Sequence, residues 1–331
     1  DCYDTGNPTD ESTPPWKGTT KRINVLKYAL NNVFKDPELV PDGKIRLAWQ
    51  SLNNTGGSST RAGDVNSPTV QKTNTMRPLK GKHDENGTHR NNFIKFVNGL
   101  KPSGSTPSHE MFAQTDAYLR AGLDKNGPWS SDPGGTGSKS TEYLGCRRNY
   151  HIMMTDGRWN GTPTELPDLS KRDNAPNLTI GQGTDIPIYS GTDSALYRDE
   201  SSGTTLADWA FYSWAQPLQT SGLSDGGKLN PSRVYQEAPD TETFGSGTDT
   251  VTLKKFWNPK YNPATWPHIV TYTIGFSEMA YSWNYASITA STQMNPFIYD
   301  GSFPQLAKGT TTWPDLTKDT EARNALDLWH A

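Results

Sequence analysis

The chain has 331 residues, of which 32 are Lys or Arg and 35 are Asp or Glu, so its formal net charge is −3. A nearly neutral chain without a basic block lacks the positive surface that nucleic-acid binding requires. No apolar run approaches the roughly 18 residues of a membrane span. Only 32% of the residues are hydrophobic, yet there are 11 Trp, 14 Tyr and 10 Phe. So many aromatic residues argue against disorder and predict a folded core that carries long polar loops.

The first 120 residues predict three helices and one strand. Residues 1–21 are rich in Asp, Thr, Pro and Gly and are expected to form coil. A helix is predicted from Arg22 to Phe34, where apolar residues recur at spacings of three and four. Alternating apolar and polar residues predict a strand over 44–52. Two further helices are predicted over 91–100 and 107–120, the second starting at a proline that suits a first helical turn.

The rest of the chain alternates strands and helices. Buried strands are predicted over 150–154 and 268–276, and helices over 206–218 and 321–329. Such alternation is typical of an α/β fold with a mostly parallel sheet. The polar segments between these elements are interpreted as insertions into one domain over 22–331, because none of them carries a core of its own. The insertions lie near 53–90, 121–145, 158–203, 219–264 and 277–320.

The chain has two cysteines, Cys2 and Cys146, and neither lies in a spacing that is typical of a thiolate metal site. They are either two free thiols or the two ends of one disulfide, which would tie the N-terminus to the strand predicted near residue 150. The loop-rich composition, with many Asn, Gly, Thr and Trp residues, is typical of extracytoplasmic proteins and favours the disulfide.

Motifs for nucleotide and zinc chemistry are incomplete. The string Gly222–Leu229 nearly matches a phosphate-binding loop, but Leu229 stands where a Ser or Thr must hold Mg²⁺, and no strand is predicted before it. His109 and Glu110 begin like a zinc-protease helix, but Ala113 occupies the position of the second histidine. The six histidines show no spacing that is typical of metal ligands. These patterns therefore do not predict an enzyme.

Thr106 and Asp156 are the remaining candidates for a site. Thr106 lies in a Gly-Ser-Thr-Pro turn that opens a predicted helix, and Asp156 directly follows a predicted buried strand. In an open α/β sheet, ligands collect at the carboxyl ends of the strands. A hydroxyl and a carboxylate there suit Mg²⁺, Mn²⁺ or Ca²⁺, and a cation with open positions can bind a partner's carboxylate, which is adhesion and not catalysis. Alternatively, Thr106 caps the helix and Asp156 holds a turn.

Four segments of the chain resemble a known family. They occur in the order TPSHEMFAQTDAYL, CRRNYHIMMTDGRWN, LADWAFYSWAQPL and WPHIVTYTIGFS. Together they resemble the N-terminal von Willebrand factor A-like domain of the type IV pilus tip adhesins, the PilC/PilY family, over about residues 22–331. The closing ALDLWHA resembles that family's passage toward a C-terminal β-propeller. The resemblance implies a doubly wound sheet and a large exported protein at the pilus tip, on the cell surface, which acts in surface adhesion and pilus assembly.

The resemblance also implies a site and partners. In the family's metal motif, Thr106 corresponds to the second-loop threonine and Asp156 to the third-loop aspartate. The first loop, Asp-x-Ser-x-Ser, is missing, and the nearest string is Asp10–Pro14. Either the intact protein has this loop upstream of Asp1, or the metal site is degenerate. The implied partners are minor pilins of the pilus tip, a surface or host ligand, and the C-terminal β-propeller of the same protein.

Three functions are therefore open. The first is a non-catalytic adhesion and assembly domain that uses a divalent cation. The second is a purely structural cap that docks minor pilins and has a degenerate metal site. The third is a secreted metal-dependent hydrolase, which requires a general base beside the metal. The sequence gives no candidate for that base.

Overall fold

The computed structural model describes residues 22–52, 73–101, 106–135, 141–155, 159, 163–175, 178–181, 192–245, 247–276, 299–317 and 321–331. The chain divides into two compact units. The N-terminal unit comprises residues 1–106 and 117–143, and the C-terminal unit comprises residues 107–116 and 144–331. No helix within the described ranges is long and apolar enough to cross a membrane.

The N-terminal unit contains two helices and a short strand pair. Its elements are α1 (Arg22–Lys35), β1 (Arg46–Leu47), β2 (Arg77–Pro78), α2 (His89–Gly99) and the end of α3 (Ser108–Arg120). Strands β1 and β2 pair antiparallel, so the strand predicted over 44–52 is reduced to two residues. The predicted helices are confirmed. They enclose an aromatic core in which the ring centroids of Trp49 and Phe93 lie 5.3 Å apart.

A buried arginine joins the loops of this unit. Arg90 lies in the first turn of α2 and is 2% exposed. Its guanidinium donates hydrogen bonds to the backbone oxygens of Phe34, Val40 and Gly81, and it forms an ion pair with Asp42 at 2.9 Å. A guanidinium has five donors in a rigid fork, so one side chain satisfies carbonyls from three separate segments.

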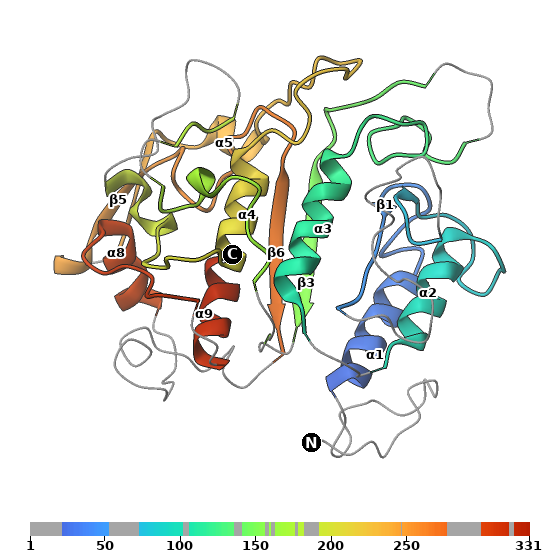
Figure 1. Cartoon of the computed structure of the whole chain (residues 1–331), viewed down its shortest axis with the longest axis horizontal. Helices are drawn as coiled ribbons and strands as arrows, with labels where there is room; N and C mark the ends of the chain where they lie inside the picture. Colours follow the sequence, from blue (N-terminus) through green and yellow to red (C-terminus); the bar gives the residue numbers. More distant parts are fainter. Residues whose placement is uncertain are drawn as a thin grey trace. The chain divides into compact units, whose positions relative to one another are not determined.

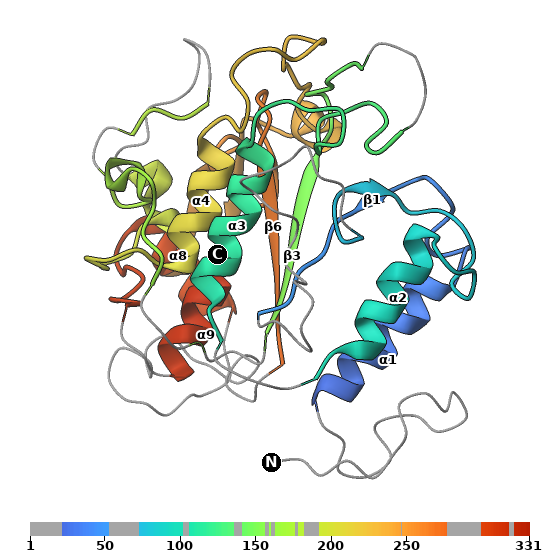
Figure 2. The same cartoon turned by 45° about the vertical axis from the view of Figure 1, so that its right-hand side comes forward.

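The C-terminal unit is built on two parallel strands, β3 (Asn149–Thr155) and β6 (Ile269–Gly275). Helices α3, α4 (Leu206–Ala215) and α9 (Glu321–His330) cover one face of this pair (Figures 1 and 2). This mixed α/β architecture with a parallel strand pair is compatible with the predicted α/β class. The core between the strands and the helices consists of Phe112, Met153, Trp159, Leu166, Leu206, Trp209, Ala210 and Leu328.

The segments interpreted as insertions contain further elements. They are η1 (Leu169–Lys171), η2 (Thr192–Tyr197), α5 (Arg233–Glu237), η3 (Gly247–Asp249) and the antiparallel pair β4 (Thr241–Phe244) and β5 (Val251–Lys254). The segment 277–320 is interpreted from the sequence as a polar insertion, and no helix is predicted in it. Helix α8 (Tyr299–Lys308) lies within this segment, so the interpretation is wrong for these residues. Pro304 disfavours a helix locally, but Leu306 is buried against Trp313 and Leu326, and this packing stabilises the helix.

Candidate functional site

The structure describes only part of the site predicted from Thr106 and Asp156. Thr106 is half-buried and lies two residues before α3, whereas Asp156 lies outside the described residues. The first turn of α3 and the carboxyl ends of β3 and β6 lie at the same end of the C-terminal unit (Figure 1). This arrangement is the one expected for ligands at the ends of parallel strands, and the cation site itself stays a prediction.

Of the two cysteines in the predicted disulfide, the structure describes only Cys146. Cys146 is exposed and forms no disulfide with any residue that the structure describes, while Cys2 lies outside those residues. Partial desolvation of the thiol, together with the neighbouring Asp225, raises the pKa of Cys146. A raised pKa disfavours the reactive thiolate. The pairing of Cys2 with Cys146 stays a prediction.

The segment Gly222–Leu229, which nearly matches a phosphate-binding loop, has a structural role. The carboxylate of Asp225, inside Gly222–Leu229, accepts hydrogen bonds from the backbone N–H groups of Gly145, Cys146 and Gly227 at 2.7–3.0 Å. Backbone N–H groups in such loops bind phosphate in nucleotide-binding proteins. Here Gly222–Leu229 supplies the carboxylate instead, and two of the three N–H donors belong to the segment that leads into β3, which this contact fixes.

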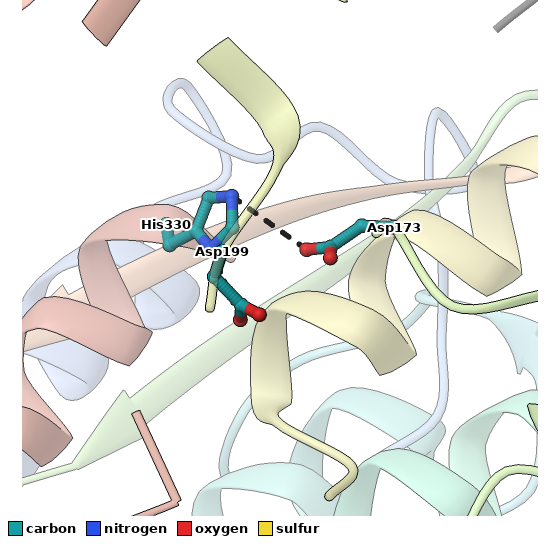
Figure 3. Close-up of side chains that lie close together, drawn as sticks. All are labelled: Asp173, Asp199 and His330. Atoms are coloured by element: carbon teal, nitrogen blue, oxygen red, sulfur yellow. Dashed lines mark ion pairs between the residues drawn. The ribbon is translucent and has the colours of Figure 1, made fainter. Parts of the chain in front are cut away.

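A cluster that the sequence did not predict lies in the C-terminal unit, where two carboxylates meet one imidazole (Figure 3). Asp173 follows η1, Asp199 follows η2, and His330 is the last residue of α9. Nε2 of His330 lies 3.6 Å from Oδ2 of Asp173, and its Nδ1 lies 3.9 Å from Oδ2 of Asp199. One potential ligand atom from each of the three side chains lies within 4.8 Å of the others.

Packing and backbone hydrogen bonds position the three side chains. The ring of His330 stacks on Trp313, with centroids 4.8 Å apart and planes inclined by 22°. Residue Asp199 forms a parallel β-bridge with Trp313, and its carboxylate accepts a hydrogen bond from the backbone N–H of Ser201. The backbone N–H of Asp173 donates to the carboxylate of Asp208 at 3.0 Å. The cluster is therefore held by contacts of three distant segments.

Two further buried aspartates next to the cluster accept hydrogen bonds at the start of α4, one from α4 itself and one from α9. Asp208 and Thr205 form a capping box, in which each side chain accepts a hydrogen bond from the other residue's backbone N–H. Asp327 of α9 accepts hydrogen bonds from the backbone N–H groups of Leu206 and Ala207, both at 2.9 Å. The first N–H groups of a helix have no partners within it and favour negative charge, so both carboxylates have clear structural roles.

Asp173 differs from these two aspartates because no donor satisfies its carboxylate. The residue is 1% exposed, and neither carboxyl oxygen accepts a hydrogen bond within the described structure. Burial and the neighbouring Asp199 raise the pKa of Asp173 well above its ordinary value of 3.8. Burial also raises the pKa of Asp199 to about 7 and lowers the pKa of His330 to about 3. A neutral imidazole therefore faces carboxylates that are costly to ionise without a cation.

The sequence carries little signal for this cluster. His330 was one of six histidines without ligand spacing, and Asp173 and Asp199 lie in the segment 158–203, which is irregular. The three residues belong to separate segments, so no local pattern joins them. The sequence also did not predict that one face of the β3–β6 pair is exposed, because the residues of that face belong to apolar runs that predict buried strands.

The face of the β3–β6 pair that points away from α3, α4 and α9 is apolar and exposed. In β3 the side chains of Tyr150 and Ile152 are 55% and 54% exposed, and in β6 those of Tyr272 and Ile274 are 53% and 39% exposed. Ile152 lies opposite Tyr272 in the register, and the rings of Tyr150 and Tyr272 lie 6.0 Å apart. We call these four residues the apolar sheet face. Parallel strands are usually covered on both faces, and contiguous exposed apolar side chains are typical of interaction surfaces.

Comparison with known proteins identifies relatives that share one name. The type IV pilus biogenesis factor PilY1 of Pseudomonas aeruginosa strain PAK is 32% identical over 286 residues, which cover 86% of this chain and 21% of that protein. The PilY1 of strain UCBPP-PA14 is 29% identical over 316 residues, covering 94% and 22%. The PilY1 of strain PAO1 is 30% identical over 290 residues, covering 86% and 21%.

The chain spans about a fifth of the length of these curated relatives. No family model matches it, and no solved structure matches it. The similarity to PilY1 runs over most of the chain, so it includes both compact units and the segments that resemble the pilus adhesins. The chain belongs to the PilC/PilY family of type IV pilus proteins.

Proposed function

We propose that this chain is a non-catalytic module of a type IV pilus biogenesis protein, and that it acts at the cell surface through protein contacts. The observation that carries the proposal is the similarity to PilY1 over 86% of the chain. Those relatives are named as pilus biogenesis factors, and the chain corresponds to about one fifth of their length. The minor pilins of the pilus tip are the proposed partners, and a C-terminal β-propeller is proposed to follow in the same protein.

The apolar sheet face is the surface that we assign to the minor pilins. Two tyrosines and two isoleucines form its centre, and aromatic residues contribute strongly to protein interfaces. Burying this face would remove apolar surface from water, which is the main driving force of association. A second protein on this face would also cover the parallel strand pair on both sides.

A positive charge introduced into this surface tests the proposal. Ile152→Lys and Tyr272→Lys, each made in the full-length protein in its own bacterium, should weaken binding to minor pilins by about 30-fold and reduce the number of surface pili. The reason is that a desolvated charge at the centre of an interface costs about 2 kcal/mol or more. Val234→Lys is the matched control, because Val234 is 60% exposed on α5 of the same unit. Normal piliation in both variants, at normal protein levels, would contradict the assignment.

We further infer a von Willebrand factor A-like, doubly wound fold, in which Thr106 and Asp156 hold Mg²⁺, Mn²⁺ or Ca²⁺ and bind a surface or host ligand. The position of the first turn of α3 beside the ends of β3 and β6 supports this arrangement (Figure 1). Asp156→Ala and treatment with a chelator should both abolish surface attachment and leave the pili in place. Attachment that survives both would favour a structural cap that docks minor pilins without a cation.

A further inference from the structure

We propose that Asp173, Asp199 and His330 form a buried site for one divalent transition-metal cation of the Zn²⁺ or Mn²⁺ class. The site would be structural, and it is separate from the proposed cation site at Thr106 and Asp156, with which it shares no residue.

The spacing of the donor atoms fits a shared cation. Two ligands at about 2.1 Å from a tetrahedral metal lie about 3.4 Å from each other. Nε2 of His330 lies 3.6 Å from Oδ2 of Asp173, whereas the 3.9 Å distance to Asp199 starts from the other ring nitrogen, Nδ1, which the same cation cannot also bind. With one ligand atom taken from each side chain, all three atoms lie within 4.8 Å of one another. A small inward movement of the side chains would bring one atom of each to bonding distance of a common centre.

The unsatisfied carboxylate of Asp173 indicates a missing positive partner. Asp208 and Asp327 are equally buried, but each accepts two backbone hydrogen bonds, whereas the two oxygens of Asp173 accept none within the described residues. The imidazole of His330 lies 3.6 Å from Asp173, which is too far for a hydrogen bond to the carboxylate. A neutral imidazole nitrogen is a common metal ligand, so a cation between the two side chains would satisfy both.

The donor set selects the class of cation. One imidazole nitrogen and two carboxylate oxygens are typical ligands of Zn²⁺ and are compatible with Mn²⁺. Ca²⁺ and Mg²⁺ prefer sites made of oxygen alone. The side chain of His330 is 4% exposed and that of Asp173 is 1% exposed, so the cation would be shielded from substrates. Its role would be to fasten the end of α9 to the segments that follow η1 and η2.

Metal titration of purified protein tests this proposal. All arms use Asp156→Ala protein, in which the other proposed cation site is removed, stripped first with a chelator. Zn²⁺ and Mn²⁺ are added separately, with Ca²⁺ and Mg²⁺ in parallel arms. We expect one equivalent of Zn²⁺ or Mn²⁺ per chain and a rise in Tm of roughly 5 °C at a hundredfold excess over Kd. Absence of binding, or binding of Ca²⁺ or Mg²⁺ in preference to Zn²⁺ and Mn²⁺, would overturn the proposal.

Substitutions of the proposed ligands test where the cation binds. Asp173→Asn and His330→Gln should each weaken Zn²⁺ binding by at least about 100-fold, because each removes one of three ligands. Asp168→Asn is the matched control, since Asp168 is an exposed aspartate that caps η1 in the same segment. Unchanged Zn²⁺ affinity in both ligand variants would place the metal elsewhere.

X-ray absorption spectroscopy of the Zn²⁺-loaded Asp156→Ala protein keeps the proposal testable if the ligand variants fail to fold. The expected zinc environment contains one imidazole and oxygen ligands, with no sulfur. A zinc–sulfur distance of about 2.3 Å would assign the metal to a cysteine and overturn the proposal.

Discussion

His151 is a buried histidine on the inward face of β3, against the ring of Phe112 at a centroid distance of 4.5 Å. Burial lowers its pKa from 6.5 to about 4. Between these two pH values the unfolded chain binds a proton that the folded chain does not bind. The contribution of His151 to stability is therefore complete above pH 6.5 and is lost as the pH falls toward 4.

We expect His151→Leu to reduce the acid sensitivity of the protein. At pH 4, protonation of this histidine in the unfolded chain lowers the free energy of unfolding of the parent by about 3 kcal/mol, and the variant does not have this loss. Urea unfolding at several pH values between 4 and 7 measures the difference between the variant and the parent. His83→Ala is the control, because His83 is not buried. A parallel pH dependence in the parent and in His151→Leu would show that this histidine does not contribute.

At the scale of elements, one carboxylate joins two helices of the C-terminal unit. Asp327, in the last turns of α9, accepts hydrogen bonds from the first two residues of α4, and both helices pack on β6. The contact satisfies donors that α4 cannot satisfy itself. Helix α9 is therefore held in place by its carboxylate as well as by its apolar residues, of which Ala325, Leu326 and Leu328 are buried.

Asp327→Ala should lower the free energy of unfolding by about 2–4 kcal/mol, because it leaves two buried N–H groups without an acceptor. Thermal and urea unfolding of the whole chain measure this loss. Glu237→Ala serves as a control, since Glu237 forms an exposed ion pair with Arg233 at 2.8 Å, and such pairs contribute less than about 1 kcal/mol. A loss in Asp327→Ala no larger than in the control would mean that water replaces the carboxylate.

At the scale of the whole molecule, the predicted disulfide between Cys2 and Cys146 would close a loop of 144 residues (146 − 2). Protein isolated from an oxidising compartment should contain no free thiol, and a reductant should lower the free energy of unfolding by about 2–5 kcal/mol. Thiol labelling under denaturing conditions and unfolding with and without reductant measure both effects. Cys146→Ser should be insensitive to reductant. Two labelled thiols in the untreated protein would disprove the bond.

Prediction of elements from the sequence succeeded where apolar periodicity was strong. Strand β3 and helix α1 lie within one residue of their predicted bounds. The apolar residues of α1 recur at helical spacing, and in β3 His151 and Met153 are buried on the inward face. Helix α2 begins two residues before its predicted start, since Thr88 caps it and polar residues fill its first turn. Helix α8 was missed because its stability depends on contacts with residues far along the chain and not on local propensity.

The sequence alone determined the α/β class and the family, because periodicity and the order of motifs are local properties that can be read along the chain. Only the tertiary structure revealed the cluster of Asp173, Asp199 and His330 and the apolar sheet face. The cluster depends on side chains from three distant segments that meet in space. The apolar sheet face depends on which side of β3 and β6 the helices cover. A run of apolar residues does not indicate which of the two faces of a strand is buried.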